Sequence, residues 1–150
     1  MKIKLFCFTF IIVLISGCLD VRKANISESI TEAANDCKSQ DCMIDINKLT
    51  NFKWDKMYVF NTATGPEEIS NAIKTDYPYY QEFTKSMVFL YKKKIVHYEN
   101  NEDDIETATD GSVIFNYPDS LHYQVYTNDQ VLFKAKKVNF DKGSYYVLYK

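Results

Sequence analysis

The sequence predicts an α+β fold: a single domain built mainly on an antiparallel sheet, with one or two helices packed on one side. Three observations lead to this prediction. Runs of aromatic and β-branched residues, typical of strands, recur through the second half of the chain. Two shorter stretches carry helix start signals instead. Twelve tyrosines and ten phenylalanines among 150 residues, with only four glycines, indicate an ordered, β-rich body.

Two helices are predicted in the first half of the chain. The first covers residues 27–34, where Ser27 can cap the N-terminus and isoleucines and alanines form a modest apolar stripe. The second begins at Pro66, after a Thr-Gly pair that can cap it, because the missing N–H of proline costs nothing in a first turn. Two acidic residues in its first turn interact favourably with the positive end of the helix dipole, and the Asp-Tyr-Pro sequence at 76–78 should end the helix.

Strands account for most of the remaining chain. In the first half, the strongest strand signal is the sequence FKWDKMYVF. In the second half, two apolar runs flank three lysines and predict a hairpin with a polar tip. A later stretch alternates between polar and apolar residues, which would place Lys134 and Lys136 on one face and Phe133 and Ala135 on the other. The predicted strands cover residues 52–60, 87–91, 95–98, 112–117, 131–138 and 145–149, with a short strand or extended segment around 44–46.

The first eighteen residues carry targeting information. A basic start precedes an apolar run at 5–15, which is too short to cross a bilayer that needs about 20 helical residues and is typical of a secretory signal. The sequence ISGC at 15–18 resembles the lipobox of bacterial lipoproteins, in which the cysteine takes a diacylglycerol and the chain is cut before it. The resemblance covers residues 1–18 and implies a signal peptide at 1–17 and a lipidated Cys18. From the residues that follow, we expect a tether at 18–26 and a single domain at 27–150. A plain secretory signal and an uncleaved anchor are the alternatives.

The same resemblance implies a place in the cell. Two or more acyl chains hold a protein firmly on a membrane, so Cys18 would be a stable anchor. In Gram-negative lipoproteins an aspartate directly after the cysteine favours the inner membrane, whereas here that position is Leu19. We therefore expect a lipid-anchored protein of the bacterial cell envelope, on the outer membrane and facing the periplasm. The cleaved chain would have 133 residues and a formal charge of −4, which argues against a nucleic-acid partner.

Two cysteines remain after the signal peptide and the lipidation site. Cys37 and Cys42 are separated by four intervening residues in a chain expected outside the cytoplasm, where a disulfide is the simplest interpretation. The chain-entropy estimate for so short a loop is about 2 kcal/mol. A redox site would more often have two intervening residues, and zinc would need further ligands nearby.

The middle of the chain shows a second, weaker resemblance. The FKWDKMYVF strand, the proline-started helix and the hairpin VFLYKKKIVHY together resemble small uncharacterised bacterial envelope lipoproteins over residues 50–99. This resemblance implies a similar fold. It carries no established activity and therefore no catalytic residues.

The sequence contains few candidates for catalytic or metal-binding residues. The three glycines after residue 17 are scattered, so no glycine-rich loop can bind a phosphate, and no hydrolase or metalloprotease motif occurs. His97 lies within a strand pattern and His122 lies near Asp119 and Ser120, neighbours too close in sequence for a usual triad. The acidic run at 102–106 lacks the ligand order of a calcium loop. We predict no cofactor and no metal site.

Three function hypotheses remain. The first is a lipid-anchored protein that binds an envelope or toxin protein, of which an inhibitory, immunity-type lipoprotein is one version. The second is a structural accessory lipoprotein of an envelope assembly, and the third is a small periplasmic hydrolase built on one of the histidines. For the first, aromatic side chains near the strand–helix unit are the preferred partner contacts, although for any one of them core packing is the more common role. These contact candidates are Trp54, Tyr58, Tyr77, Tyr79 and Tyr80.

Overall fold

The computed structural model describes residues 25–37, 42–102, 108–118 and 120–150. Within these residues the chain forms three helices and eight strands. In chain order they are α1 (Ile26–Asn35), β1 (Cys42–Asp45), α2 (Ile46–Leu49), β2 (Lys56–Phe60), α3 (Pro66–Ile73), β3 (Lys85–Tyr91), β4 (Lys94–Asn101), β5 (Val113–Phe115), β6 (Tyr123–Thr127), β7 (Leu132–Phe140) and β8 (Gly143–Tyr149).

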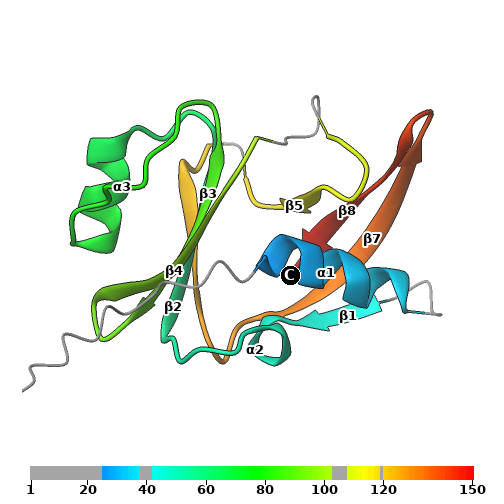
Figure 1. The fold of residues 1–150 in the computed structure, drawn as a ribbon, viewed down its shortest axis with the longest axis horizontal. Helices are drawn as coiled ribbons and strands as arrows, with labels where there is room; N and C mark the ends of the chain where they lie inside the picture. The colour runs from blue at the N-terminus through cyan, green and yellow to red at the C-terminus, as the bar shows by residue number, and fades with distance from the viewer. Residues whose placement is uncertain (1–24, 38–41, 103–107, 119) are drawn as a thin grey trace, which may run out of the picture.

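The strands form two four-stranded sheets (Figure 1). The first sheet has the order β1-β7-β8-β5 and the second has the order β4-β3-β2-β6. All neighbours are antiparallel except β5 and β8, which are parallel. The α+β prediction is confirmed, but the strands are divided between two sheets, whereas the sequence led us to expect a main one.

The helices also divide between two places. The apolar side of α1 packs with inward-facing side chains of both sheets in the main core. Helix α3 packs instead on the opposite face of the second sheet, where Ile69 and Ile73 join a smaller core with Tyr58, Phe60 and Val88. In Figure 1, α3 accordingly lies beside β3 and far from β7 and β8.

Strands β2 and β3 are therefore covered on both faces. Met57 and Phe89 belong to the main core, whereas Phe60 and Leu90 belong to the smaller core under α3. A strand covered on both faces needs apolar residues at consecutive positions. This explains why the strand signals of β2 and β3 are continuous apolar runs and not alternating patterns.

Local signals place the helix ends to within a few residues. Helix α1 begins at Ile26, which is fully buried and so belongs to the fold and not to the expected tether. Its cap is Asn25, whose side chain accepts a hydrogen bond from the Glu28 backbone. Helix α3 begins at Pro66 as predicted and ends at Ile73, before the Asp-Tyr-Pro sequence, because Lys74 adopts a left-handed conformation.

The predicted hairpin is formed by β3 and β4. Tyr91 pairs with Lys94, which leaves Lys92 and Lys93 as a two-residue loop. Both have positive φ, 50° and 65°, as a type I′ turn requires. The bulge between Phe89 and Leu90 shifts the register along the hairpin.

Candidate functional site

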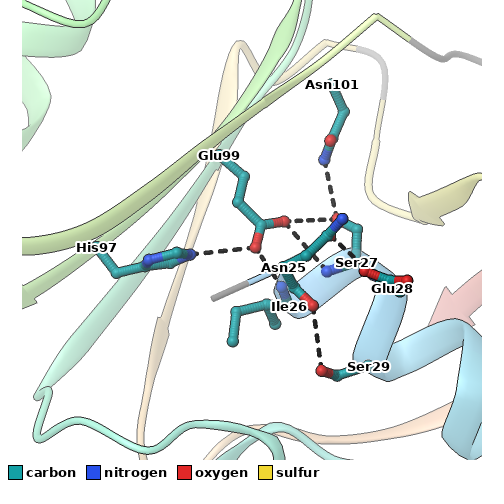
Figure 2. Close-up of polar contacts among 8 residues, drawn as sticks. All are labelled: Asn25, Ile26, Ser27, Glu28, Ser29, His97, Glu99 and Asn101. Carbon is teal, nitrogen blue, oxygen red and sulfur yellow. Dashed lines mark hydrogen bonds and ion pairs between the residues drawn. The ribbon is translucent and has the colours of Figure 1, made fainter. Parts of the chain in front are cut away.

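The main polar junction of the molecule joins α1 to β4 through Glu99 (Figure 2). Its carboxylate accepts hydrogen bonds from the backbone N–H of Ile26, from the backbone N–H of Ser27 at 3.1 Å and from the Ser27 hydroxyl at 2.7 Å. The amide side chain of Asn101 donates to the same hydroxyl at 3.0 Å. A carboxylate at a helix N-terminus satisfies otherwise unpaired N–H groups and opposes the helix dipole. Glu99 therefore fixes the start of α1 against the second sheet.

His97 lies on the other side of this carboxylate. Its Nε2 atom is 3.1 Å from Oε1 of Glu99, and the side chain is 1% exposed. The imidazole packs against the rings of Phe52 and Phe89, with centroids 5.0 and 5.6 Å away. Its Nδ1 atom is buried without a hydrogen-bond partner among the described residues. His97 thus lies in an aromatic, solvent-shielded part of the core.

The order of these groups bears on the hydrolase hypothesis. In a catalytic triad the imidazole lies between the hydroxyl and the carboxylate, so that it can take the hydroxyl proton. Here the carboxylate of Glu99 lies in the middle, between Ser27 and His97 (Figure 2). The Ser27 hydroxyl is hydrogen-bonded directly to a carboxylate, and the imidazole has no path to solvent. This geometry positions a helix and does not activate a nucleophile.

His122 has a partner of its own. Its Nδ1 atom is 2.7 Å from Oε1 of Glu68, and both side chains are well exposed. The pair connects α3 to the segment before β6. The Thr64 hydroxyl donates to the backbone carbonyl of His122 at 2.8 Å and not to its ring, so the pair resembles a surface contact more than a site for proton transfer.

The five aromatic contact candidates separate into two groups. Trp54, Tyr58 and Tyr77 are buried, with exposed fractions of 5%, 6% and 3%. Trp54 packs edge-on against Phe89 and donates from its indole N–H to Thr50, and the Tyr77 hydroxyl donates to Asn100. These three side chains have core roles in the structure.

Tyr79 and Tyr80 reach the surface. Tyr79 is 36% exposed, and its ring stacks on Tyr98 with a centroid distance of 4.0 Å and an interplanar angle of 12°. Tyr80 is half-buried beside the smaller core. Of the predicted contacts, these two are placed where a partner could touch them.

Cys37 and Cys42 lie together between the end of α1 and the start of β1. No S–S bond joins them in the structure, and the predicted disulfide stays a prediction. Their side chains are hydrogen-bonded to each other, and Cys42 also donates to the Ala33 carbonyl at 3.9 Å. Burial, and secondarily the Cys37 contact, raises the pKa of the Cys42 thiol to about 11. A thiol with so high a pKa is a poor nucleophile at neutral pH.

The outer face of the first sheet is a surface that sequence reasoning only half identified. Met43 and Leu132 are each 53% exposed there, although both are large apolar residues. Met43 is paired with Lys134, and Lys136 follows on the same face of β7, so the face combines apolar and basic groups, with the half-buried Asp45 opposite Leu132. We call Met43, Leu132, Lys134 and Lys136 the basic sheet face. The only sequence signal for Leu132 is that it shares the alternation of the two lysines.

An open groove of about 980 Å³ adjoins this face. The exposure of the four side chains shows that no described segment covers them. The groove lining includes Lys134 and Lys136 of the basic sheet face, both cysteines and the end of α1. It is lined by Ala34, Asn35, Cys37, Cys42, Lys134, Ala135, Lys136, Lys137, Asn139, Tyr146 and Tyr149.

Other kinds of site are not found in the part of the chain that the structure describes. No three histidine, cysteine or acidic side chains there come together as metal ligands. None of the helices described is both long and apolar enough to span a bilayer. The Cys18 lipidation site and most of the acidic run lie outside the described residues.

Comparison of the chain with protein-family models, curated proteins and solved structures found no match. The candidate surfaces therefore have to be judged on their own geometry and chemistry.

Proposed function

We propose that this protein is a lipid-anchored protein of the bacterial cell envelope that acts by binding a protein partner. The anchor is supported by the short apolar run and the sequence ISGC, which ends at Cys18. The binding role is supported by one structural observation above all: the basic sheet face presents large apolar side chains to solvent beside lysines.

This face has the chemistry of an interaction surface. Large exposed apolar groups beside polar ones are typical of sites that another molecule covers. The chain as a whole carries a formal charge of −2, so a face with two lysines and exposed Met43 and Leu132 differs from the average surface. The partner that fits best is a protein with an acidic rim around an apolar patch, because opposite charges speed association and select the partner.

The two alternatives to this proposal are a structural accessory lipoprotein and a small hydrolase, and different observations separate each from it. A structural accessory lipoprotein would use the same face, but it would copurify with an envelope complex in fixed stoichiometry. An inhibitory or immunity-type protein would bind only when the toxin is present. The hydrolase hypothesis is not favoured, because Glu99 lies between Ser27 and His97, and in the described part of the chain the ring of His122 is paired with the carboxylate of Glu68.

The anchor is tested by mass spectrometry of the protein extracted from membranes. We expect a mature chain that begins at Cys18 and carries acyl chains, and we expect Cys18→Ser to lose membrane retention. An intact Met1, or a mature start at another residue, would contradict the proposal.

The binding face is tested with the full-length protein purified in detergent. Leu132→Asp and Lys136→Glu should each abolish capture of the partner from envelope or competitor-cell extracts. Their matched controls are Leu121→Asp and Lys94→Glu, which make the same changes at exposed positions elsewhere and should leave capture intact.

Equal effects of the face variants and their controls would contradict this assignment. His97→Phe and His122→Ala provide the comparison with the enzyme hypothesis. If either histidine variant is folded and normally abundant but fails to rescue the deletion phenotype, catalysis would be favoured instead.

A further inference from the structure

A second group of exposed apolar side chains lies in the loop between α3 and β3. Phe83 is 78% exposed, the highest value for a large hydrophobic residue among the described residues, and Tyr79, four positions earlier in the same loop, is 36% exposed. Tyr80 lies between them, half-buried. We call Tyr79, Tyr80 and Phe83 the aromatic loop.

The backbone of this loop holds Phe83 outward at an energetic cost. Phe83 has a φ of 59°, a left-handed conformation that non-glycine residues rarely adopt. On either side the loop is fixed: the Thr84 hydroxyl donates to the Gln81 carbonyl at 2.9 Å, and the Asn100 amide donates to the Tyr79 carbonyl at 2.7 Å. The exposure of Phe83 is therefore built into the fold.

The aromatic loop lies where the described chain begins. Asn25 lines the same open depression of about 680 Å³ as Tyr79, Tyr80 and Tyr98. Figure 2 shows why this position is fixed, since Glu99 on β4 holds the first two residues of α1 directly after Asn25. The start of the domain and the aromatic loop are thus held at one edge of the second sheet.

Chain length then limits how far this edge can be from a membrane. Seven residue steps separate Cys18 from Asn25, and even a fully extended chain would span no more than about 25 Å. If Cys18 carries the lipid, Asn25 lies within that reach of the bilayer surface, and Tyr79 and Tyr80 line the same depression as Asn25. Tyrosine is enriched at membrane–water interfaces, and an exposed phenylalanine gains free energy by leaving water.

From these observations we infer that the aromatic loop rests on the membrane that holds the anchor, with Phe83 and Tyr79 entering the interfacial layer. This inference rests on the proposed lipidation of Cys18. Among the exposed charged residues of the same segment, Asp76 and Glu82 outnumber Lys74, which opposes binding to an anionic surface. The contact is therefore apolar, it suits a zwitterionic surface, and it is insensitive to salt.

This orientation has a consequence for the basic sheet face. That face belongs to the first sheet, whereas the aromatic loop leads into β3 of the second, so the partner surface and the membrane contact use different residues of the domain. The lipid and the loop together would hold the domain in one orientation, where a flexible tether alone would let it tumble.

The test uses the full-length lipidated protein reconstituted in phosphatidylcholine vesicles, some containing lipids with brominated acyl chains. Phe83→Trp introduces a reporter into the loop, and Leu132→Trp introduces the matched control on the basic sheet face. The natural Trp54 is buried and present in both variants, so the unmodified protein supplies the background. We expect bromine to quench the tryptophan at position 83 severalfold more than the one at position 132, equally at low and high salt.

The outcomes separate the inference from the proposal on which it rests. Mass spectrometry of each preparation establishes whether Cys18 is lipidated, and an unlipidated native protein overturns both. A lipidated protein whose position 83 is quenched no more than position 132 overturns only the membrane contact. A blue-shifted but unquenched signal at position 83 also overturns it, because the loop is then covered by protein.

Discussion

The Oγ atom of Ser27 lies 2.7 Å from Oε2 of Glu99, although 72 positions separate the two residues in the chain. The same carboxylate binds the first backbone N–H groups of α1. A helix end that would otherwise depend on its own cap is thus attached to the second sheet by a charged side chain. The entry point of the expected tether is fixed by the same contacts.

We predict that Glu99→Gln lowers the free energy of unfolding by about 2 kcal/mol, because charge-assisted hydrogen bonds to a helix N-terminus are lost. Urea denaturation measures the change. Glu82→Gln, on an exposed carboxylate of the loop before β3, is the control and should stay within about 0.5 kcal/mol of the unmodified protein. Equal effects of the two variants would show that the charge of Glu99 does not hold α1.

The two neighbouring thiols give a redox prediction. In protein from an oxidising compartment, Cys37 and Cys42 should be bonded to each other and resist alkylation until a reductant is added. Reduction should lower the free energy of unfolding by about 2 kcal/mol, as expected for a short loop. Ready labelling of either thiol in native protein that has never been reduced would contradict the prediction.

After reduction, the buried thiol should react slowly. The pKa of the Cys42 thiol is raised to about 11, chiefly by burial, so little thiolate is present near pH 8. Its alkylation rate should rise with pH toward that value. A rate that levels off near pH 9 would mean that Cys42 is not shielded as the structure indicates.

Buried tyrosines predict a loss of stability at alkaline pH. Burial raises the pKa of Tyr126 and of Tyr77 to about 12. An unfolded chain releases these protons near pH 10, so the folded state binds more protons above that value and the free energy of unfolding falls from pH 10 to pH 12. Two pKa units correspond to about 3 kcal/mol, which solvent screening of these partly buried hydroxyls lowers to about 2 kcal/mol for each residue; this contribution is fully present below pH 10.

Urea denaturation between pH 8 and pH 11 measures this slope. Tyr126→Phe removes one of the two groups and should make the loss of stability with pH less steep. An unchanged slope would mean that Tyr126 ionises in the folded state at its ordinary pKa.

The β3–β4 turn can be improved. Lys92 and Lys93 both have positive φ, which lysine tolerates poorly and the Asn-Gly pair adopts readily. The double variant Lys92→Asn, Lys93→Gly should therefore raise the free energy of unfolding by about 1 kcal/mol. The variant keeps the hydrogen bond from the backbone N–H of position 92 to Asp55, because the donor belongs to the main chain. A destabilised variant would show that the lysine side chains have a role at this tip.

Local signals predicted most elements correctly. Proline at the start of α3, the apolar runs of the β3–β4 hairpin and the alternation of β7 each depend on residues near one another in sequence, and each is confirmed. Strand β6 was missed, because YQVYT is short and is an edge strand whose identity depends on its pairing with β2. The cap of α1 was assigned to Ser27, but Asn25 has that role and Ser27 binds Glu99.

The candidate surfaces were harder to predict. Trp54 and Tyr58 are of residue types that are common in protein interfaces, yet side chains from distant strands and from α3 bury them. Phe83 looks like an ordinary loop residue, and nothing near it in sequence announces its exposure. The lysine face of β7 was visible in the alternation, but Met43 reaches it only through the pairing of β1 with β7.

By itself the sequence determined the α+β class, the positions of most strands and helices and the candidate anchor, because backbone propensity, turn chemistry and hydrophobic period act over a few neighbouring residues. Tertiary structure alone decided how the strands divide between two sheets and which aromatic side chains remain at the surface. It alone also decided that the carboxylate of Glu99 caps a helix more than seventy residues away. These features depend on which faces meet, and a face is buried or exposed only by residues that the chain brings from far along its length.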